Sequence, residues 1–274
     1  MTDTRTGEEV VVISPDGWSA DLDLVQGTGH FREIVGPTLG ARERSLHHID
    51  LGPDSTTAYL SHPDDAVYYV VSGIAQIQAA GTDENLVAGS MVHILASTAY
   101  RLASIAGAVV LGGPSPVDPG LYDRRSVVPP PVADVAHEGA VTIHHQDRPG
   151  LMMPMISADA RLVVWLGSGA LTANMNYVVL EAGERNREHV HLYSADTIHI
   201  LEGHGTAEDL THGLRLPIGP GDTVHIKPGI WHAVSADRNE RVVSVGGPCP
   251  ADLDMLHAAG VDVDALTKVR AHST

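Results

Sequence analysis

Short apolar runs, separated by clusters of Gly, Pro and Asp, recur along most of the chain. Runs such as 178–180 and 242–245 have the length and the β-branched content of strands, and few stretches show the 3.6-residue spacing of an amphipathic helix. One helix is predicted, over about 250–259, with acidic residues in its first turns and Gly260 as a stop. Many short strands between turn residues predict an all-β fold of the sandwich or barrel kind.

The pattern of apolar positions repeats once along the chain. Three segments reappear with slowly growing offsets of 130, 132 and 134 residues: 66–73 with 196–203, 92–94 with 224–226, and 112–118 with 246–252. A duplicated domain with small loop insertions produces such offsets. We therefore predict an N-terminal domain over 1–128, a Pro-rich linker over 129–139 and a C-terminal domain over 140–274.

Potential metal ligands gather in the second of these domains. His189 and His191 flank a single residue, so on an extended chain both imidazoles point to the same side. Asp196 follows in the next strand, and His232 comes after a Pro-Gly turn that ends a later one. Three imidazoles and one carboxylate, mostly from neighbouring strands, form a suitable ligand set for a divalent transition metal.

The two segments that carry these ligands resemble the two sequence motifs of the cupin family. The first motif spaces a Gly, a His-x-His pair, an acid and a second Gly, and the second motif spaces a Gly, a Pro-x-Gly turn, a His and an Asn. The matching residues are Gly183, His189, His191, Gly203, Gly221, Gly229 and His232, whereas Asp196 replaces Glu, Lys227 replaces Pro and Ala236 replaces Asn. The resemblance implies two tandem jelly-roll barrels (double-stranded β-helices) with a short C-terminal helix. It also implies that the metal is bound by His189, His191, Asp196 and His232.

The first domain keeps the repeat but not the ligands. At its aligned positions Leu60 and His62 replace the His-x-His pair, Ala66 replaces the acid and Tyr100 replaces the last histidine. One imidazole does not hold a metal firmly, so we expect a metal-free N-terminal barrel that serves as a structural partner. We also expect His62 to lie in a solvated turn and His199 to lie at the surface or at a sheet edge.

Further residues near the ligands are candidates for catalysis or substrate binding. Asp196 is a direct ligand, holds the metal through a water, or acts as a base beside it. Tyr193 lies between His191 and Asp196 and is the second catalytic candidate, as a donor of a proton or a hydrogen bond. Arg187 is a candidate partner for a substrate carboxylate, and Trp231 is a candidate wall of the pocket.

Composition limits the partners and the compartment. A formal net charge of −17 argues against nucleic acid, whose binders need clustered Lys and Arg. No run approaches the ~20 apolar residues of a membrane helix, and the N-terminus lacks the apolar core of a secretion signal. The single cysteine, Cys249, fits a reducing compartment, so we predict a cytoplasmic protein. A homodimer is a further expectation, because cupin barrels often associate through sheet edges.

The four ligands would leave two positions open on a six-coordinate metal, enough for a bidentate substrate or for a substrate and O2. The resemblance then implies an O2-using, dioxygenase-type oxidoreductase that acts on a small polar or anionic metabolite. Two alternatives stay open: a non-redox hydrolase, isomerase or decarboxylase with a layout similar to ureidoglycine aminohydrolase, and a cupin that binds a small molecule without chemistry. We expect one divalent metal per chain, with Fe(II) or Mn(II) ahead of Ni(II) or Zn(II).

Overall fold

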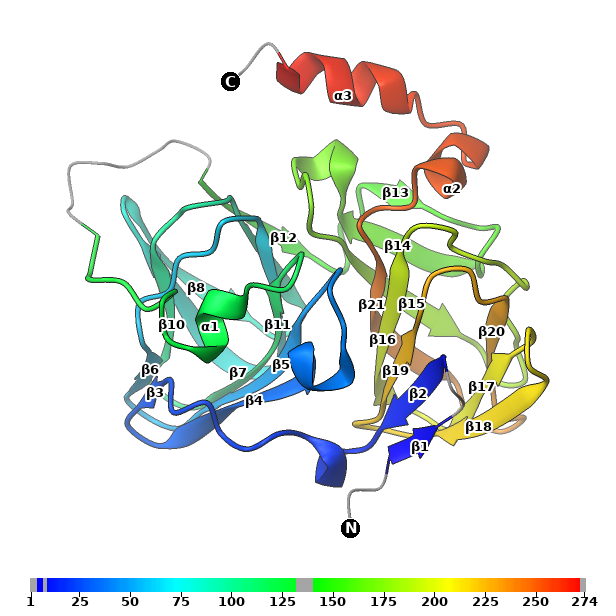
Figure 1. Cartoon of the computed structure of the whole chain (residues 1–274), viewed down its shortest axis with the longest axis horizontal. Coiled ribbons are helices and arrows are strands. Elements are labelled where there is room, and N and C mark those ends of the chain that lie inside the picture. Colours follow the sequence, from blue (N-terminus) through cyan, green and yellow to red (C-terminus); the bar gives the residue numbers. More distant parts are fainter. Residues whose placement is uncertain (1–3, 7–8, 132–139, 272–274) are drawn as a thin grey trace. The chain divides into compact units, whose positions relative to one another are not determined.

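The computed structural model describes residues 4–6, 9–131 and 140–271 (Figure 1). Strands follow one another through both halves of the chain, and the helices are short and few, so the all-β prediction is confirmed. No helix among the described residues is long and apolar enough to cross a membrane.

Two compact units divide the chain. One comprises Ile13–Pro149 with the first four residues, and the other comprises Gly150–Thr274 with Arg5–Val12. The expected C-terminal domain started at 140, but strand β12 (Val141–His145) pairs with a strand of the N-terminal unit. Most of the expected linker lies outside the described residues. Local sequence patterns do not reveal which barrel a terminal strand joins, because the choice depends on which sheet edge is available to it.

The N-terminal unit is an antiparallel β structure with two 3-10 turns and one short helix. Its elements are η1 (Pro15–Gly17), β3 (Val25–Gln26), β4 (Gly29–Val35), η2 (Pro37–Leu39), β5 (Leu46–Leu51), β6 (Ser55–Thr57), β7 (Ala66–Ala79), β8 (Thr82–Val87), β9 (Ser90–Ile94), β10 (Tyr100–Ser104), β11 (Ala108–Pro114), α1 (Pro119–Tyr122) and β12.

The long strand β7 holds this unit together. Its first part pairs with β9 and β11, and its second part pairs with β8 and β10. The inward side chains pack into one apolar cluster that includes Phe31, Ile49, Tyr68, Ile77 and Leu102. Because β7 contributes to both groups of strands, it closes them around a single core.

The C-terminal unit contains the predicted metal ligands. Its elements are β1 (Thr4–Thr6), β2 (Val10–Ile13), β13 (Leu151–Met152), β14 (Asp159–Val164), η3 (Leu166–Ser168), β15 (Met175–Leu180), β16 (Ala195–Glu202), β17 (Gly205–Asp209), β18 (Leu214–Ile218), β19 (Thr223–Ile226), β20 (His232–Ala236), β21 (Val242–Cys249), α2 (Leu253–Ala258) and α3 (Val263–Ala271).

Strand β16 lies at the centre of this unit. An eight-stranded sheet has the order β1-β2-β19-β16-β21-β15-β14-β13, and a three-stranded sheet has the order β18-β17-β20. Asp196, Ile198 and Ile200 share one face of β16, as the alternation predicts, with Ile200 packed in the core. The carboxylate of Asp196 is thereby placed on the inner side of the larger sheet.

The C-terminal end of the chain forms two helices where one was expected. The helix predicted over 250–259 is α2, which begins after Asp252, whose side chain accepts a hydrogen bond from the Met255 N–H. The second helix, α3, was missed because its sequence shows only a weak amphipathic pattern. Both helices contribute to an apolar cluster with β14, in which Leu256 and Leu266 pack near Trp165.

The glycine that ends β16 provides a test of the strand's packing. Gly203 has φ +79°, and a Cβ there would overlap the carbonyl oxygen of Arg241. Gly213 has a similar φ of +70° but open space around it. We expect Gly213→Ala to cost about 1–2 kcal/mol of unfolding free energy, from backbone conformation alone. Gly203→Ala is expected to cost clearly more in chemical denaturation, and equal losses would contradict the close approach.

Candidate metal centre

The four predicted ligands come together in the C-terminal unit. His189 and His191 lie in the segment before β16, Asp196 is the second residue of β16, and His232 is the first residue of β20. The His232 N–H donates to the His189 carbonyl at 2.9 Å, and the His189 N–H donates to the His232 carbonyl at 3.2 Å. This backbone bridge holds the two imidazoles beside each other, with ring centroids 4.3 Å apart.

The donor atoms of these side chains surround one point. One donor atom from each residue lies within 4.8 Å of the other three. Asp196 Oδ2 is 3.5 Å from His232 Nε2 and 3.7 Å from His191 Nε2, both long for hydrogen bonds. Metal–ligand bonds of about 2.0–2.2 Å give separations of this order between ligands of one ion. Asp196, His191 and His232 are buried, and His189 is partly exposed.

Hydrogen bonds at the far side of each ring fix the imidazole tautomers. Nδ1 of His189 is 2.8 Å from the Arg187 carbonyl oxygen, and Nδ1 of His232 is 2.8 Å from the Ile230 carbonyl oxygen. Nδ1 of His191 is 2.6 Å from Oδ2 of Asp252. Carbonyl and carboxylate oxygens only accept, so each Nδ1 must carry the proton. All three Nε2 lone pairs are therefore free to face the carboxylate of the cluster.

Two buried atoms of the cluster support a bound cation. Oδ1 of Asp196 and Nε2 of His232 have no hydrogen-bond partner among the described residues. Buried polar atoms without protein partners are rare, and a bound ion is one accepted cause. Three neutral imidazole nitrogens and one carboxylate oxygen suit Fe, Mn, Ni and Zn. The residues present therefore fit the divalent metal that the sequence predicts.

The charge states of the cluster suit metal binding. Burial alone would raise the pKa of Asp196, but the nearby His232, His191 and His189 outweigh it and lower that pKa to about 2. Burial and the two neighbouring imidazoles lower the pKa of His189 to about 4. At neutral pH the acid is thus ionised and this imidazole is neutral, the forms that bind a metal.

A cavity of about 60 Å³ adjoins the ligands. His189, His191 and Asp196 form part of its wall, together with Asn176 and a larger number of aliphatic and Met side chains. Ile198, from the same face of β16 as the acid, is one of these. The metal position therefore faces a small and mainly apolar space.

The other candidate residues lie elsewhere. Tyr193 is 80% exposed and Trp231 is 50% exposed, and neither lines this cavity. Arg187 and Trp231 instead line a wide surface groove of about 670 Å³. That groove and the cavity share the side chains of Ile156 and Asn186. Arg187, Trp231 and Tyr193 therefore lie outside the cavity, and their roles stay predictions.

Sequence reasoning assigned no role at the site to Asp252. Asp252 caps α2, and its carboxylate accepts a hydrogen bond from Nδ1–H of His191. This hydrogen bond lowers the pKa of the Asp252 carboxyl, against the effect of burial. The signal was present in the repeat, since 112–118 and 246–252 both end in Asp. Carboxylates that orient a metal-bound histidine commonly strengthen metal binding.

Comparison with known families identifies the domain that carries the ligands. Residues 176–245 match the family described as Cupin domain. The matched segment contains all four ligands, from His189 to His232. No curated protein matches the chain.

Solved structures extend the comparison to both units. A structure of oxalate decarboxylase from Bacillus subtilis, a protein with Mn(II) centres, superposes with a TM-score of 0.66. The identity is 10%, and 96% of this chain and 86% of that chain are covered. Protein Ylba from E. coli gives 0.64 and 13%, with 89% and 93% covered. Vicilin from Corylus avellana gives 0.62 and 13%, with 88% and 85% covered. The C-terminal unit therefore contains a cupin domain, and the chain as a whole shares the two-barrel fold of these proteins. Identities this low show a shared fold and do not transfer an activity.

The N-terminal unit has the same backbone frame without the predicted ligands. Leu60 and Tyr100 bridge each other through two backbone hydrogen bonds of 2.7 and 2.9 Å, as His189 and His232 do. His62 Nδ1 is 2.7 Å from Oδ2 of Asp118, which caps α1 as Asp252 caps α2. The repeat deduced from the sequence therefore places equivalent residues at equivalent points.

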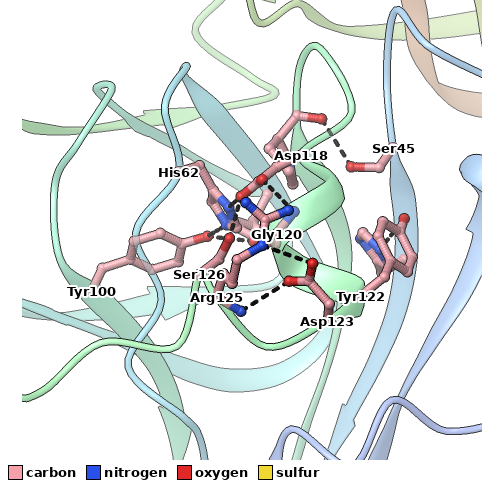
Figure 2. A network of polar contacts seen from close by, with 12 residues as sticks. Ser45, His62, Tyr100, Asp118, Gly120, Tyr122, Asp123, Arg125 and Ser126 are labelled. Atoms are coloured by element: carbon pink, nitrogen blue, oxygen red, sulfur yellow. Dashed lines mark hydrogen bonds and ion pairs between the residues drawn. The ribbon is translucent and has the colours of Figure 1, made fainter.

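A hydrogen-bond chain occupies the interior of the N-terminal barrel (Figure 2). Nε2 of His62 lies 2.9 Å from the Tyr100 hydroxyl, which also contacts the Tyr68 hydroxyl, and Asp118 accepts from Ser126 as well. Burial raises the pKa of both tyrosines, so their hydroxyls stay protonated. His62 is only 3% exposed, so the expectation of a solvated turn was wrong.

Two other histidines of the C-terminal unit form hydrogen bonds between neighbouring strands. His199 is 5% exposed, and its Nδ1 lies 2.8 Å from the Thr223 hydroxyl, so the prediction of a surface position was wrong. His225 is also buried and contacts the Thr197 hydroxyl at 3.0 Å. These contacts run between β16 and β19, on the face of β16 opposite Asp196. The alternation placed His199 on the right face, but that face is covered.

Asp252 can be tested with a variant that keeps its helix cap. Asn caps a helix about as well as Asp. The Asp252 carboxylate accepts from Met255 N–H with one oxygen and from His191 Nδ1–H with the other, whereas an amide has only one oxygen that can accept. We expect Asp252→Asn to weaken metal binding by about 10–100-fold, measured as Kd by metal titration. Asp118→Asn makes the same change in the other barrel and should leave metal affinity unchanged. Equal affinities for both variants and the parent protein would contradict the role of Asp252.

The hydrogen-bond chain of the N-terminal barrel gives a stability prediction. Tyr100→Phe removes the partner of His62 Nε2 and of the Tyr68 hydroxyl. We expect a loss of about 1–3 kcal/mol in unfolding free energy, with metal content unchanged. Tyr193→Phe, at an exposed position, should leave stability within error. A Tyr100→Phe protein as stable as its parent would mean that the chain of hydrogen bonds contributes nothing net.

Proposed function

We propose that this protein is a mononuclear metal-dependent enzyme and that its reaction uses O2. The observation that carries the proposal is the convergence of three unprotonated Nε2 atoms and an ionised carboxylate beside a cavity. A bound divalent metal supplies a Lewis acid for a chelating substrate and, as Fe(II), electrons for O2. His189, His191, Asp196 and His232 would hold it.

The cavity wall favours oxygen chemistry over proton-transfer chemistry. Its polar members besides the ligands are Arg161, Asn176, Asn186 and Ser244. None of these is an ordinary general acid or base at neutral pH. Asp196 is the only carboxylate among the described residues of the wall, so it is the only side chain besides the histidines that could carry a proton. Hydrolysis and decarboxylation usually need such a group to move a proton. The apolar wall would also exclude water from a reactive substrate.

A non-redox reaction, in particular a decarboxylation, is the second candidate. It is supported by the shared fold with oxalate decarboxylase, whose Mn(II) centres suit the same kind of ligand set. In that case Asp196 would act as the proton carrier beside the metal. A small-molecule-binding protein without chemistry is the third, and the fold shared with vicilin keeps it open.

Metal analysis and oxygen uptake separate these functions. We expect protein purified without air to hold one divalent metal per chain, and a substrate to trigger O2 consumption. His191→Ala and His232→Ala should each abolish metal retention, because each removes one of the four donors and three ligands hold the ion less firmly. His204→Ala, at an exposed imidazole, is the control. Turnover that is indifferent to air would select the non-redox reaction, and metal retained by both ligand variants would refute the site.

A further inference from the structure

The wall of the metal cavity is more apolar than a site for small dianions would be. Met153, Leu162, Val178, Ile198, Val245 and Met255 all contribute to it. Met153 directly follows β13, and the others come from β14, β15, β16, β21 and α2, so the apolar surface surrounds the space on several sides. An ionised group placed against such a surface loses hydration without compensation, whereas a methylene gains by leaving water.

The one cation of the cavity wall among the described residues is already engaged. The guanidinium of Arg161 makes two hydrogen bonds to Asp159, at 2.6 and 2.7 Å, and lies over the ring of Tyr177. Asn186 is likewise committed, since its Oδ1 accepts from the Val234 N–H at 2.8 Å. A second carboxylate of a substrate would therefore find no free positive partner in the wall.

Asn176 is a polar group of the wall that is still available to a substrate. Its side chain lines the cavity, and its Oδ1 is buried without a hydrogen-bond partner among the described residues. A buried amide oxygen in this position is satisfied by a donor or a water. The wall thus offers one hydrogen-bond acceptor to a donor group on the head of a ligand and hydrocarbon for the remainder.

We propose that the substrate is a small chelator with a single anionic or enolisable head and a short apolar body, and not a compact dianion such as oxalate. This proposal rests on the proposed metal site. The head would bind the metal, an enol or hydroxyl group on it would donate to Oδ1 of Asn176, and the body would lie against Leu162, Ile198 and Met255. The cavity volume of about 60 Å³ limits the body to a few carbon atoms.

A series of 2-oxo acids tests the proposal, because all members share one chelating head. Glyoxylate, pyruvate, 2-oxobutanoate, 2-oxopentanoate and 2-oxohexanoate would be titrated without air into Mn(II)-loaded protein, with oxalate for comparison. Each methylene buried at ~0.8 kcal/mol should tighten binding about fourfold until the cavity is full. Affinity should then fall for longer chains. Equal affinities along the series, or oxalate binding more tightly than the best 2-oxo acid, would overturn the proposal.

A matched pair of variants locates the body of the ligand. Leu162→Ala enlarges the cavity and should move the optimum to a longer chain, whereas Leu166→Ala makes the same change at a buried position outside it. Ile198→Val is the milder variant if Leu162→Ala does not fold, and it should lengthen the optimum by about one carbon. An optimum that stays fixed in the cavity variants would overturn the proposal.

Metal content measured on the same samples separates the two possible failures. Protein that holds no Mn(II) would overturn the proposed metal site and, with it, this substrate class. Protein that holds Mn(II) but prefers oxalate would overturn the substrate class alone.

Discussion

Four electron-pair donors meet at one point in the C-terminal barrel with no proton between them. The protons of His189, His191 and His232 are held on the outer nitrogens by oxygens that only accept. Their inner nitrogens and the carboxylate of Asp196 repel one another unless a cation lies among them. The backbone bridge between His189 and His232 fixes two of the rings, and the residue that caps α2 fixes the third. The positions of the donors therefore follow from the backbone around them.

The N-terminal barrel shows what the same frame does without that ion. The histidine–aspartate pair is kept, as His62 and Asp118, but the inner nitrogen of the ring faces the hydroxyl of Tyr100. A hydroxyl both donates and accepts, so a chain of hydrogen bonds satisfies the buried groups where a metal would otherwise be needed. Leu60 and Ala66 fill the remaining positions with hydrocarbon.

An apolar wall beside a charged centre has consequences for chemistry. The low polarity strengthens interactions between the centre and whatever binds it, and it penalises any charge that the centre does not neutralise. The neighbouring groove, which carries Arg187 and Trp231, is wider and more polar. The two spaces therefore offer different surroundings to a bound molecule, one apolar and enclosed, the other polar and open.

The sequence determined the all-β class, the internal repeat and the four side chains that cluster as predicted ligands, because two-residue alternation and motif spacing are local properties of the chain. Only the tertiary structure decided that β12 pairs with β9, that Asp252 reaches back to His191, and that His62 and His199 are buried. Each of these depends on which surfaces meet after the chain has folded. A residue's face on a strand can be read from its neighbours in sequence, whereas what covers that face comes from segments far away along the chain.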